Sequence, residues 1–198
     1  MTFVQSYLEQ TVEIARSIDA AAVDAMVDVL KRVRERGGRL FLIGSGGGAG
    51  HSSHATCDFR KICGFEAYCP TDNVSELSAR INDEGWDTSI SNWLRGSRFG
   101  ADDCVFVFSV GGGSEEKNIS MNLVNALKLA QEVGASVVGV VGRDGGYTAQ
   151  VADACVVVPT VEPALVTAHT EAYQAVVWHM LASHPELQVA PMKWESTK

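Results

Sequence analysis

Residues 39–50 have the sequence RLFLIGSGGGAG, an apolar run that ends directly in a glycine-rich turn. The run from Arg39 to Ile43 is typical of a short strand that is buried on both faces of a parallel sheet. Glycines after such a strand let the backbone turn sharply into a helix and approach a bound ligand closely. The stretch therefore predicts a strand, a ligand-binding turn and a helix that starts near His51.

Similar apolar runs recur along the chain and predict a parallel sheet. Three more buried strands are expected at 104–109, 136–141 and 154–158, and a weaker one at 65–69. Helices are expected between them, over 51–62, 74–81, 86–95, 115–133 and 166–183. Strands that alternate with helical segments of this length indicate an α/β fold whose sheet is covered by helices on both faces.

Residues 1–36 are expected to form two antiparallel helices ahead of the sheet. Apolar residues at spacings of three and four form one stripe up to Ile18 and a second stripe from Val23 to Val33, with Asp19 between them as a helix N-cap. The tail over 188–198 is polar and is expected to be loosely held. Since no linker, repeat or low-complexity tract interrupts the sequence, residues 1–198 are expected to form a single domain.

Charge and composition exclude several classes of protein. The formal net charge is -8, which argues against a general nucleic-acid binder, because such proteins need a basic face. No apolar run reaches the roughly 18 residues that a membrane helix needs, and the first 20 residues lack the features of a signal peptide. We therefore expect a cytoplasmic protein with no nucleic-acid or membrane partner. The five cysteines show no CxxC spacing, so they are expected to be reduced and mostly in the core.

Most of the 19 glycines lie in three clusters, at 37–50, 111–113 and 139–146, each at the end of a predicted strand. In an open parallel sheet the ligand crevice lies outside the carboxyl ends of the strands, so the clusters are expected to line one mouth. The acidic residue that would bind a dinucleotide ribose is absent, because the next strand ends in Cys69-Pro70-Thr71. The Walker lysine is also absent, and no nucleotide cofactor is expected.

The second glycine cluster predicts a phosphate-binding turn. In SVGGGS, Ser109 and Ser114 flank a turn that is expected to run directly into a helix. Free N–H groups at the start of that helix and the two hydroxyls would then point at one phosphate. The alternative is that the glycines only permit tight turns and that Ser114 only caps the helix. Two glycine-rich turns in one chain favour the phosphate.

Histidines and carboxylates at helical spacing indicate a second functional set. His51, His54 and Asp58 project from one face of the helix after the first turn, and Glu171 and His179 lie eight residues apart on the last helix. If the two helices meet at the mouth or across a subunit boundary, two imidazoles and two carboxylates come together. Such a set can bind a divalent metal or can transfer protons. The alternative is that these side chains are merely solvated or hydrogen-bonded.

In their order along the chain, these motifs resemble the sugar isomerase (SIS) family, and within it the phosphoheptose isomerases. The matching motifs are the strand that ends in GSGGG, the pair His54-x-x-x-Asp58, NDEGW at 82–86, SVGGGS at 109–114, VGRDGG at 141–146, and Glu171 followed by His179. The resemblance covers nearly the whole chain. It implies a doubly wound, five-stranded parallel sheet with an N-terminal helical hairpin, and a homotetramer whose active sites lie between subunits.

The resemblance also implies an activity. It implies aldose–ketose isomerisation of a sugar phosphate through an enediol, with sedoheptulose 7-phosphate as the expected substrate. Asp58 would be the base beside the carbonyl, and His179 would complete the proton transfer. The candidate zinc ligands that it implies are His54, Asp58, Glu171 and His179. The residues that it places around the substrate and its phosphate are Ser45, Gly46, Gly47, Gly48, Asp83, Ser109, Ser114 and Glu171.

The chain departs from the family pattern at several of these positions. Ser45, Gly48 and Gly111 stand where the family has asparagine or serine, and Asp58 is one methylene shorter than the family's glutamate. A second hypothesis, from a different class, is a non-catalytic SIS module that binds a sugar phosphate as a sensor or serves as a tetrameric assembly factor, as in a replication-initiator-associated relative. That hypothesis predicts loss of the carboxylate–histidine set. Because most of the set is present, the isomerase is favoured.

Overall fold

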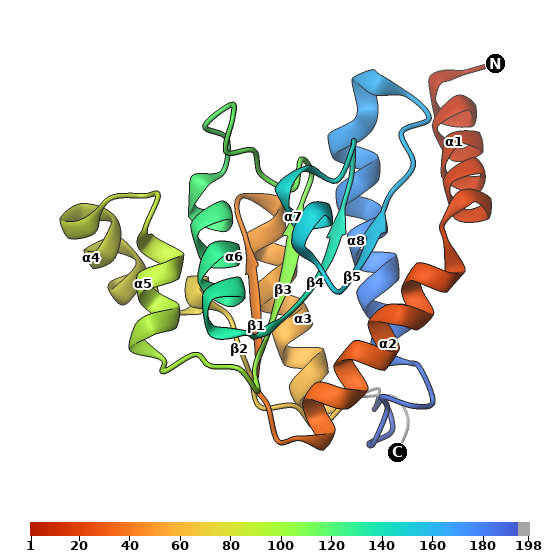
Figure 1. Ribbon diagram of the computed structural model, residues 1–198. Helices are drawn as coiled ribbons and strands as arrows, with labels where there is room; N and C mark the ends of the chain where they lie inside the picture. Colours follow the sequence, from red (N-terminus) through yellow and green to blue (C-terminus); the bar gives the residue numbers. More distant parts are fainter. Residues whose placement is uncertain (194–198) are drawn as a thin grey trace.

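The structure, a computed structural model, describes residues 1–193 and is built around one parallel sheet (Figure 1). The strands pair in the order β2-β1-β3-β4-β5, and every pairing is parallel. Their bounds are Leu40–Gly44 for β1, Ala67–Tyr68 for β2, Cys104–Ser109 for β3, Ser136–Val141 for β4 and Ala154–Val157 for β5. The predicted α/β fold with a five-stranded, doubly wound parallel sheet is confirmed.

Helices cover both faces of the sheet. Their bounds are α1 Phe3–Ser17, α2 Ala20–Glu35, α3 Gly47–Lys61, α4 Val74–Glu84, α5 Ser89–Gly96, α6 Met121–Val133, α7 Gly146–Val151 and α8 Val166–Ala182, with 3-10 turns at Pro70–Asp72 and Pro163–Leu165. The short helix α7 was not predicted. Within residues 1–193, none of the helices has the length and apolar content that a membrane crossing requires.

Side chains of β1 alternate between two hydrophobic cores, one on each face of the sheet. Leu40 and Leu42 pack with α2, α3 and α8, whereas Phe41 and Ile43 pack with α5 and α6. The alternation follows from the strand period of two. It explains why the strand is apolar at every position, and it fixes α3 and α8 on the same face.

The helix expected over 115–133 begins six residues later, at Met121. Ser114 and Ile119 instead exchange two backbone hydrogen bonds, each with an N···O distance of 2.9 Å. The Ser114 hydroxyl accepts a hydrogen bond from the N–H of Lys117, which lies in the same loop. The polar sequence between Ser114 and Ile119 has no apolar side chain to bury, so it forms a surface loop. The second glycine turn therefore does not run directly into a helix.

The two N-terminal helices are present, and the Asp19 carboxylate caps α2 by accepting hydrogen bonds from two backbone N–H groups. They do not form the expected antiparallel pair, because α2 continues away from α1 in Figure 1. Helix α1 is tied to α8 instead, since the Tyr173 hydroxyl donates to the carbonyl of Thr11. Only Ile18 and Asp19 separate the two helices.

The C-terminal segment after α8 returns to the end of α3. The backbone N–H groups of Val189 and Ala190 both donate to the carbonyl of Ile62, over 2.8 and 3.1 Å. Residues 194–198, the last part of the predicted loosely held tail, lie outside the described residues. The loosely held tail and the single-domain organisation stay predictions.

Gly48 is a position in the first turn where the backbone packing requires glycine. A Cβ atom there would overlap the carbonyl oxygen of Phe108 in β3. We expect Gly48→Ala to lower the free energy of unfolding by about 1–3 kcal/mol, measured by urea denaturation. Gly50→Ala in the same helix is the matched control, because nothing lies within 4 Å of its Cβ. That variant is expected to gain up to about 1 kcal/mol, and equal stability of the two variants would contradict the assignment.

Candidate functional site

The first glycine turn places the start of α3 at the carboxyl end of the sheet. Gly46 is the N-cap, with φ +58 and ψ -124, a conformation that favours glycine, and its position carries no capping side chain. The first N–H groups of a helix have no partner within the helix. In α3 the N–H groups of Gly48 and Ala49 donate to the carbonyls of Ser45 and Gly46, over 3.1 Å each, which leaves the N–H of Gly47 for an anion at this helix end.

The start of α6 lies beside the same turn. The Asn122 amide donates to the Ser45 hydroxyl over 3.0 Å. Asn122 is fully buried, and among residues 1–193 its Oδ1 has no hydrogen-bond partner. Ser120, the N-cap of α6, makes no capping hydrogen bond within the described residues. Two helix N-termini thus meet across the Ser45–Asn122 contact, and we call this place the double N-terminus.

The two predicted phosphate serines of the second turn lie in different surroundings. Ser109 ends β3, and its hydroxyl accepts a hydrogen bond from the N–H of Gly112 over 3.0 Å. Ser114 lies in the loop before α6 and lines a cavity of about 770 Å³ together with Lys117 and Arg143. Ser114 is therefore not at a helix N-terminus, because the helix begins after Ser120.

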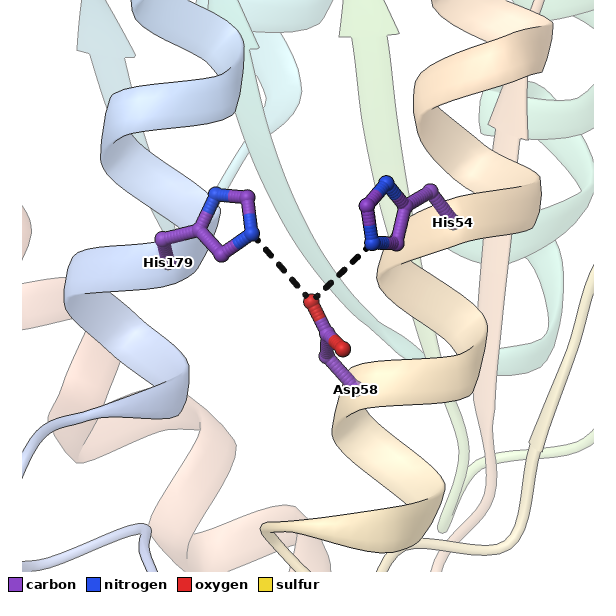
Figure 2. Close-up of side chains that lie close together, drawn as sticks. All are labelled: His54, Asp58 and His179. Atoms are coloured by element: carbon purple, nitrogen blue, oxygen red, sulfur yellow. Dashed lines mark ion pairs between the residues drawn. The ribbon is translucent and has the colours of Figure 1, made fainter. Parts of the chain in front are cut away.

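Helices α3 and α8 bring three of the four predicted zinc ligands together, as Figure 2 shows. The Nε2 atoms of His54 and His179 lie 3.8 and 3.6 Å from Oδ2 of Asp58. One ligand atom from each of the three residues lies within 4.8 Å of the other two. We call these residues the His–Asp cluster. They line a cavity of about 740 Å³, and residues 190–193 line it as well.

Hydrogen bonds from the surroundings order the His–Asp cluster. Nδ1 of His179 lies 2.8 Å from the carbonyl oxygen of Ala175. Since a carbonyl only accepts, Nδ1 carries a proton, and Nε2 is the ring nitrogen that faces Asp58. The Trp178 indole N–H donates to Oδ2 of Asp58 over 3.1 Å. The side chain of Asp58 is 15% exposed, against 59% for His54 and 50% for His179, so the carboxylate is the sheltered member.

The chemistry of this donor set fits a divalent metal ion. Two imidazole nitrogens and one carboxylate oxygen are a common set of zinc ligands, and they leave a further position open for substrate or water. A lone pair and a negative charge that face each other also need a positive charge between them. Either a metal or a proton on an imidazole satisfies that requirement.

Glu171 and Asp83 lie away from the His–Asp cluster within this chain. Glu171 is eight residues before His179, about 12 Å along the helix, and its carboxylate lies against Gly47 at the double N-terminus. Asp83 accepts a hydrogen bond from Asn82 near the end of α4, at the edge of the molecule opposite α1 in Figure 1. His51 also stays outside the cluster, since its Nδ1 pairs with Gln174 Oε1 over 2.8 Å.

Comparison with known proteins shows which proteins the chain resembles in sequence. No model of a protein family matches the chain. The lincomycin biosynthesis protein LmbN of Streptomyces lincolnensis is 29% identical over 191 residues, which span 91% of this chain and 68% of that protein. A phosphoheptose isomerase of Mycobacterium tuberculosis is also 29% identical over 191 residues, spanning 93% of this chain and 91% of that protein.

The solved structure of phosphoheptose isomerase from Neisseria gonorrhoeae has the same fold. It matches with a TM-score of 0.76 and 24% identity, over 90% of this chain and 94% of that one. The chain is similar to phosphoheptose isomerases of the sugar isomerase (SIS) type in sequence and in fold. The resemblance noted from the sequence motifs is confirmed, and it extends over nearly the whole chain.

Two contacts of the site were not predicted from the sequence. Asn122 was placed in the middle of a predicted helix, whereas it lies in the first turn of α6, where it reaches Ser45. Trp178 was not considered as a site residue, but its indole contacts Asp58. No local motif marks either contact, because both join residues that are far apart in the sequence.

Proposed function

We propose that this protein is an aldose–ketose isomerase that acts on a sugar phosphate, with sedoheptulose 7-phosphate as its substrate. The observation that carries the proposal is the sheltered Asp58 carboxylate between two open imidazoles, 3.8 and 3.6 Å away. A carboxylate base beside an imidazole is the pair of groups that proton transfer next to a carbonyl needs. The relatives named phosphoheptose isomerase support the choice of substrate.

The proposed reaction moves protons between two carbons and two oxygens. In the direction from ketose to aldose, Asp58 takes a proton from carbon 1 and holds it. The His179 imidazolium, which is protonated at both ring nitrogens, gives its own Nε2 proton to the oxygen on carbon 2. The product of this step is an enediol. The hydroxyl on carbon 1 then returns a proton to His179, while carbon 2 receives the proton held by Asp58. The chain's two groups end in their starting states, as catalysis requires.

We propose zinc as the alternative source of positive charge in the His–Asp cluster, held by His54, Asp58 and His179 when Nε2 of His179 carries no proton. The proton transfers above use the form in which Nε2 of His179 is protonated. A bound zinc ion supplies positive charge that polarises the carbonyl and stabilises the enediolate. Glu171, the fourth implied ligand, is too far along α8 to join the same cluster, so a neighbouring subunit is proposed to provide it. The fit of the donor set supports this proposal.

Zinc uptake tests the cluster directly. We expect the metal-free chain to bind about one zinc ion, and His54→Ala or His179→Ala to lower that affinity at least about 100-fold, because each removes a ligand. Competition with a chromophoric chelator measures the affinity. His184→Ala is the control, since His184 lies outside the cluster and accepts a hydrogen bond from the Glu186 N–H. Equal affinity in all of these variants would contradict the ligand assignment.

The double N-terminus is proposed to bind the phosphate once the Glu171 carboxylate, which lies against Gly47, turns away toward the cluster of a neighbouring subunit. Ser45 and Gly46 precede α3, the Gly47 N–H lies in its first turn, and Ser109 is the last residue of the neighbouring strand β3. Backbone N–H groups and hydroxyls bind phosphate without a net positive charge, which fits an acidic protein. Ser120 occupies the N-cap position of α6 without a capping hydrogen bond in the described residues, whereas the helix was expected to begin after Ser114. Ser114 stays a predicted phosphate ligand that would act from the loop.

The substrate is proposed to bind between subunits of a homotetramer. Seven bonds separate carbon 2 from the phosphorus of a heptose 7-phosphate, an extended span of about 8–9 Å at roughly 1.2 Å per bond. Asp58 lies eleven residues after Gly47, about 16 Å along α3, so one chain does not offer both sites to one molecule. A neighbouring copy would supply the phosphate site, and with it Glu171 or Asp83.

Exposed apolar side chains on α1 and α8 support association. They are Phe3, Val4, Leu8, Val12, Val176 and Met180. Several exposed apolar side chains on neighbouring helices favour a site of protein contact. Light scattering is expected to give four copies. A charged sugar phosphate is a metabolite that stays inside the cell, so we propose that the protein works in the cytoplasm.

Incubation of the pure protein with sedoheptulose 7-phosphate tests the activity. Formation of the aldose, followed by NMR, is the expected result, with zinc content measured on the same sample. Other ketose phosphates run in parallel define the substrate. If none of them is isomerised, the proposal fails. Binding without turnover would favour the sensor hypothesis, which the retained cluster disfavours.

A further inference from the structure

Trp178 is a buried residue that contacts every member of the His–Asp cluster. Its side chain belongs to the core and is 3% exposed. The centroid of its ring lies 4.7 Å from that of His179 and 5.4 Å from that of His54. On its other side, the Phe108 ring of β3 meets it edge-on at 5.8 Å. The indole is therefore held by the sheet and fixed against the cluster.

The indole N–H donates to one particular oxygen of Asp58. That atom is Oδ2, at 3.1 Å, and it is the same oxygen that faces both imidazoles. A buried indole N–H without an acceptor is unfavourable, so folding itself favours this rotamer of the carboxylate. The two histidines are at least half exposed and contribute little to that choice.

We infer that Trp178 is a positioning residue, which aims the Asp58 carboxylate at the point between His54 and His179. This inference rests on the proposed function of the cluster. An aspartate has a short side chain, so a small change in its torsion angle moves the oxygen away from both imidazoles. The indole N–H removes that freedom. Groups that orient a ligand in this way commonly affect metal affinity or activity by 10- to 100-fold when they are removed.

Trp178→Phe tests the inference because it removes the N–H and keeps an aromatic ring in the core. We expect zinc affinity to fall about 10- to 100-fold, and kcat for isomerisation to fall by a similar factor while KM stays the same. Trp93→Phe is the matched control. Trp93 is also buried, and its indole N–H has no hydrogen-bond partner among residues 1–193, so neither quantity is expected to change. Thermal unfolding checks that both variants are folded.

A double variant separates positioning from general packing. Trp178→Phe is expected to cost much less zinc affinity in an Asp58→Ala background, because the carboxylate that Trp178 orients is then gone. A purely structural role predicts the same loss in both backgrounds. Wild-type affinity and kcat in Trp178→Phe, or the same loss with and without Asp58, would overturn the inference.

The hydrogen bond itself gives a readout that does not depend on activity or metal. With 15N-labelled tryptophan, the Trp178 indole N–H signal is assigned by its absence in Trp178→Phe. It is expected to shift in Asp58→Ala, whereas the Trp93 signal is expected to stay in place. An unshifted Trp178 signal overturns the inference. The Trp178 signal can shift in Asp58→Ala while the wild-type chain neither isomerises a ketose phosphate nor binds zinc. In that case the proposed function fails and the contact stands.

Discussion

Asp58→Asn is expected to lower kcat for isomerisation of sedoheptulose 7-phosphate by about 10²- to 10⁴-fold, the usual contribution of a general base. Asparagine has the same shape as aspartate, and its oxygen can still accept the hydrogen bond from Trp178. It cannot take a proton from carbon. The loss is therefore expected in kcat, with the folded structure retained. Initial rates of aldose formation by NMR, at saturating substrate, measure the effect.

A control for Asp58→Asn comes from a carboxylate outside the site. Asp102 is exposed and lies before β3, at the end of the strand opposite the glycine turns. Asp102→Asn makes the same chemical change and is expected to keep wild-type kcat. If Asp58→Asn retained more than about a tenth of the wild-type kcat, a different group would be the base, and the mechanism proposed above would be wrong.

The sheet was predictable because a continuous apolar run has few ways to be buried. The strands Cys104–Ser109 and Ser136–Val141 were predicted at their observed bounds. The run over 65–69 shortened to Ala67–Tyr68, since β2 is an edge strand with a neighbour on one side only. The start of α6 was missed because backbone hydrogen bonds close the loop before it, and such bonds leave no trace in side-chain patterning.

The candidate site was predictable only where its residues share a helix. His54 and Asp58 are four residues apart on α3, so helical periodicity placed them on one face. Their approach to His179 depends on the packing of α3 beside α8, which periodicity does not determine. For the same reason the sequence grouped Glu171 with the cluster, although the straight helix keeps Glu171 about 12 Å from His179. Spacing along one helix predicts a shared face, but it does not predict a shared site.

A mixture of two inactive variants is expected to regain activity if the site lies between subunits. Asp58→Asn removes the base, and Ser120→Asp places a negative charge at the start of α6, where it repels the phosphate. Aspartate is a good helix N-cap and tolerates the left-handed backbone of Ser120, so this variant is expected to fold. Each variant alone is expected to be inactive on sedoheptulose 7-phosphate.

In tetramers that assemble at random from equal amounts of the two variants, about a quarter of the sites combine an intact His–Asp cluster with an intact phosphate site from a neighbour. The expected activity is therefore about a quarter of the wild-type activity per chain, measured after the variants are unfolded and refolded together. A mixture of Asp58→Asn with His179→Ala is the control. It is expected to stay inactive, because both residues belong to the cluster that one chain builds. If the first mixture also stayed inactive, a single chain would hold the whole site, and the 16 Å along α3 between Gly47 and Asp58 would have to be bridged by a different placement of the phosphate.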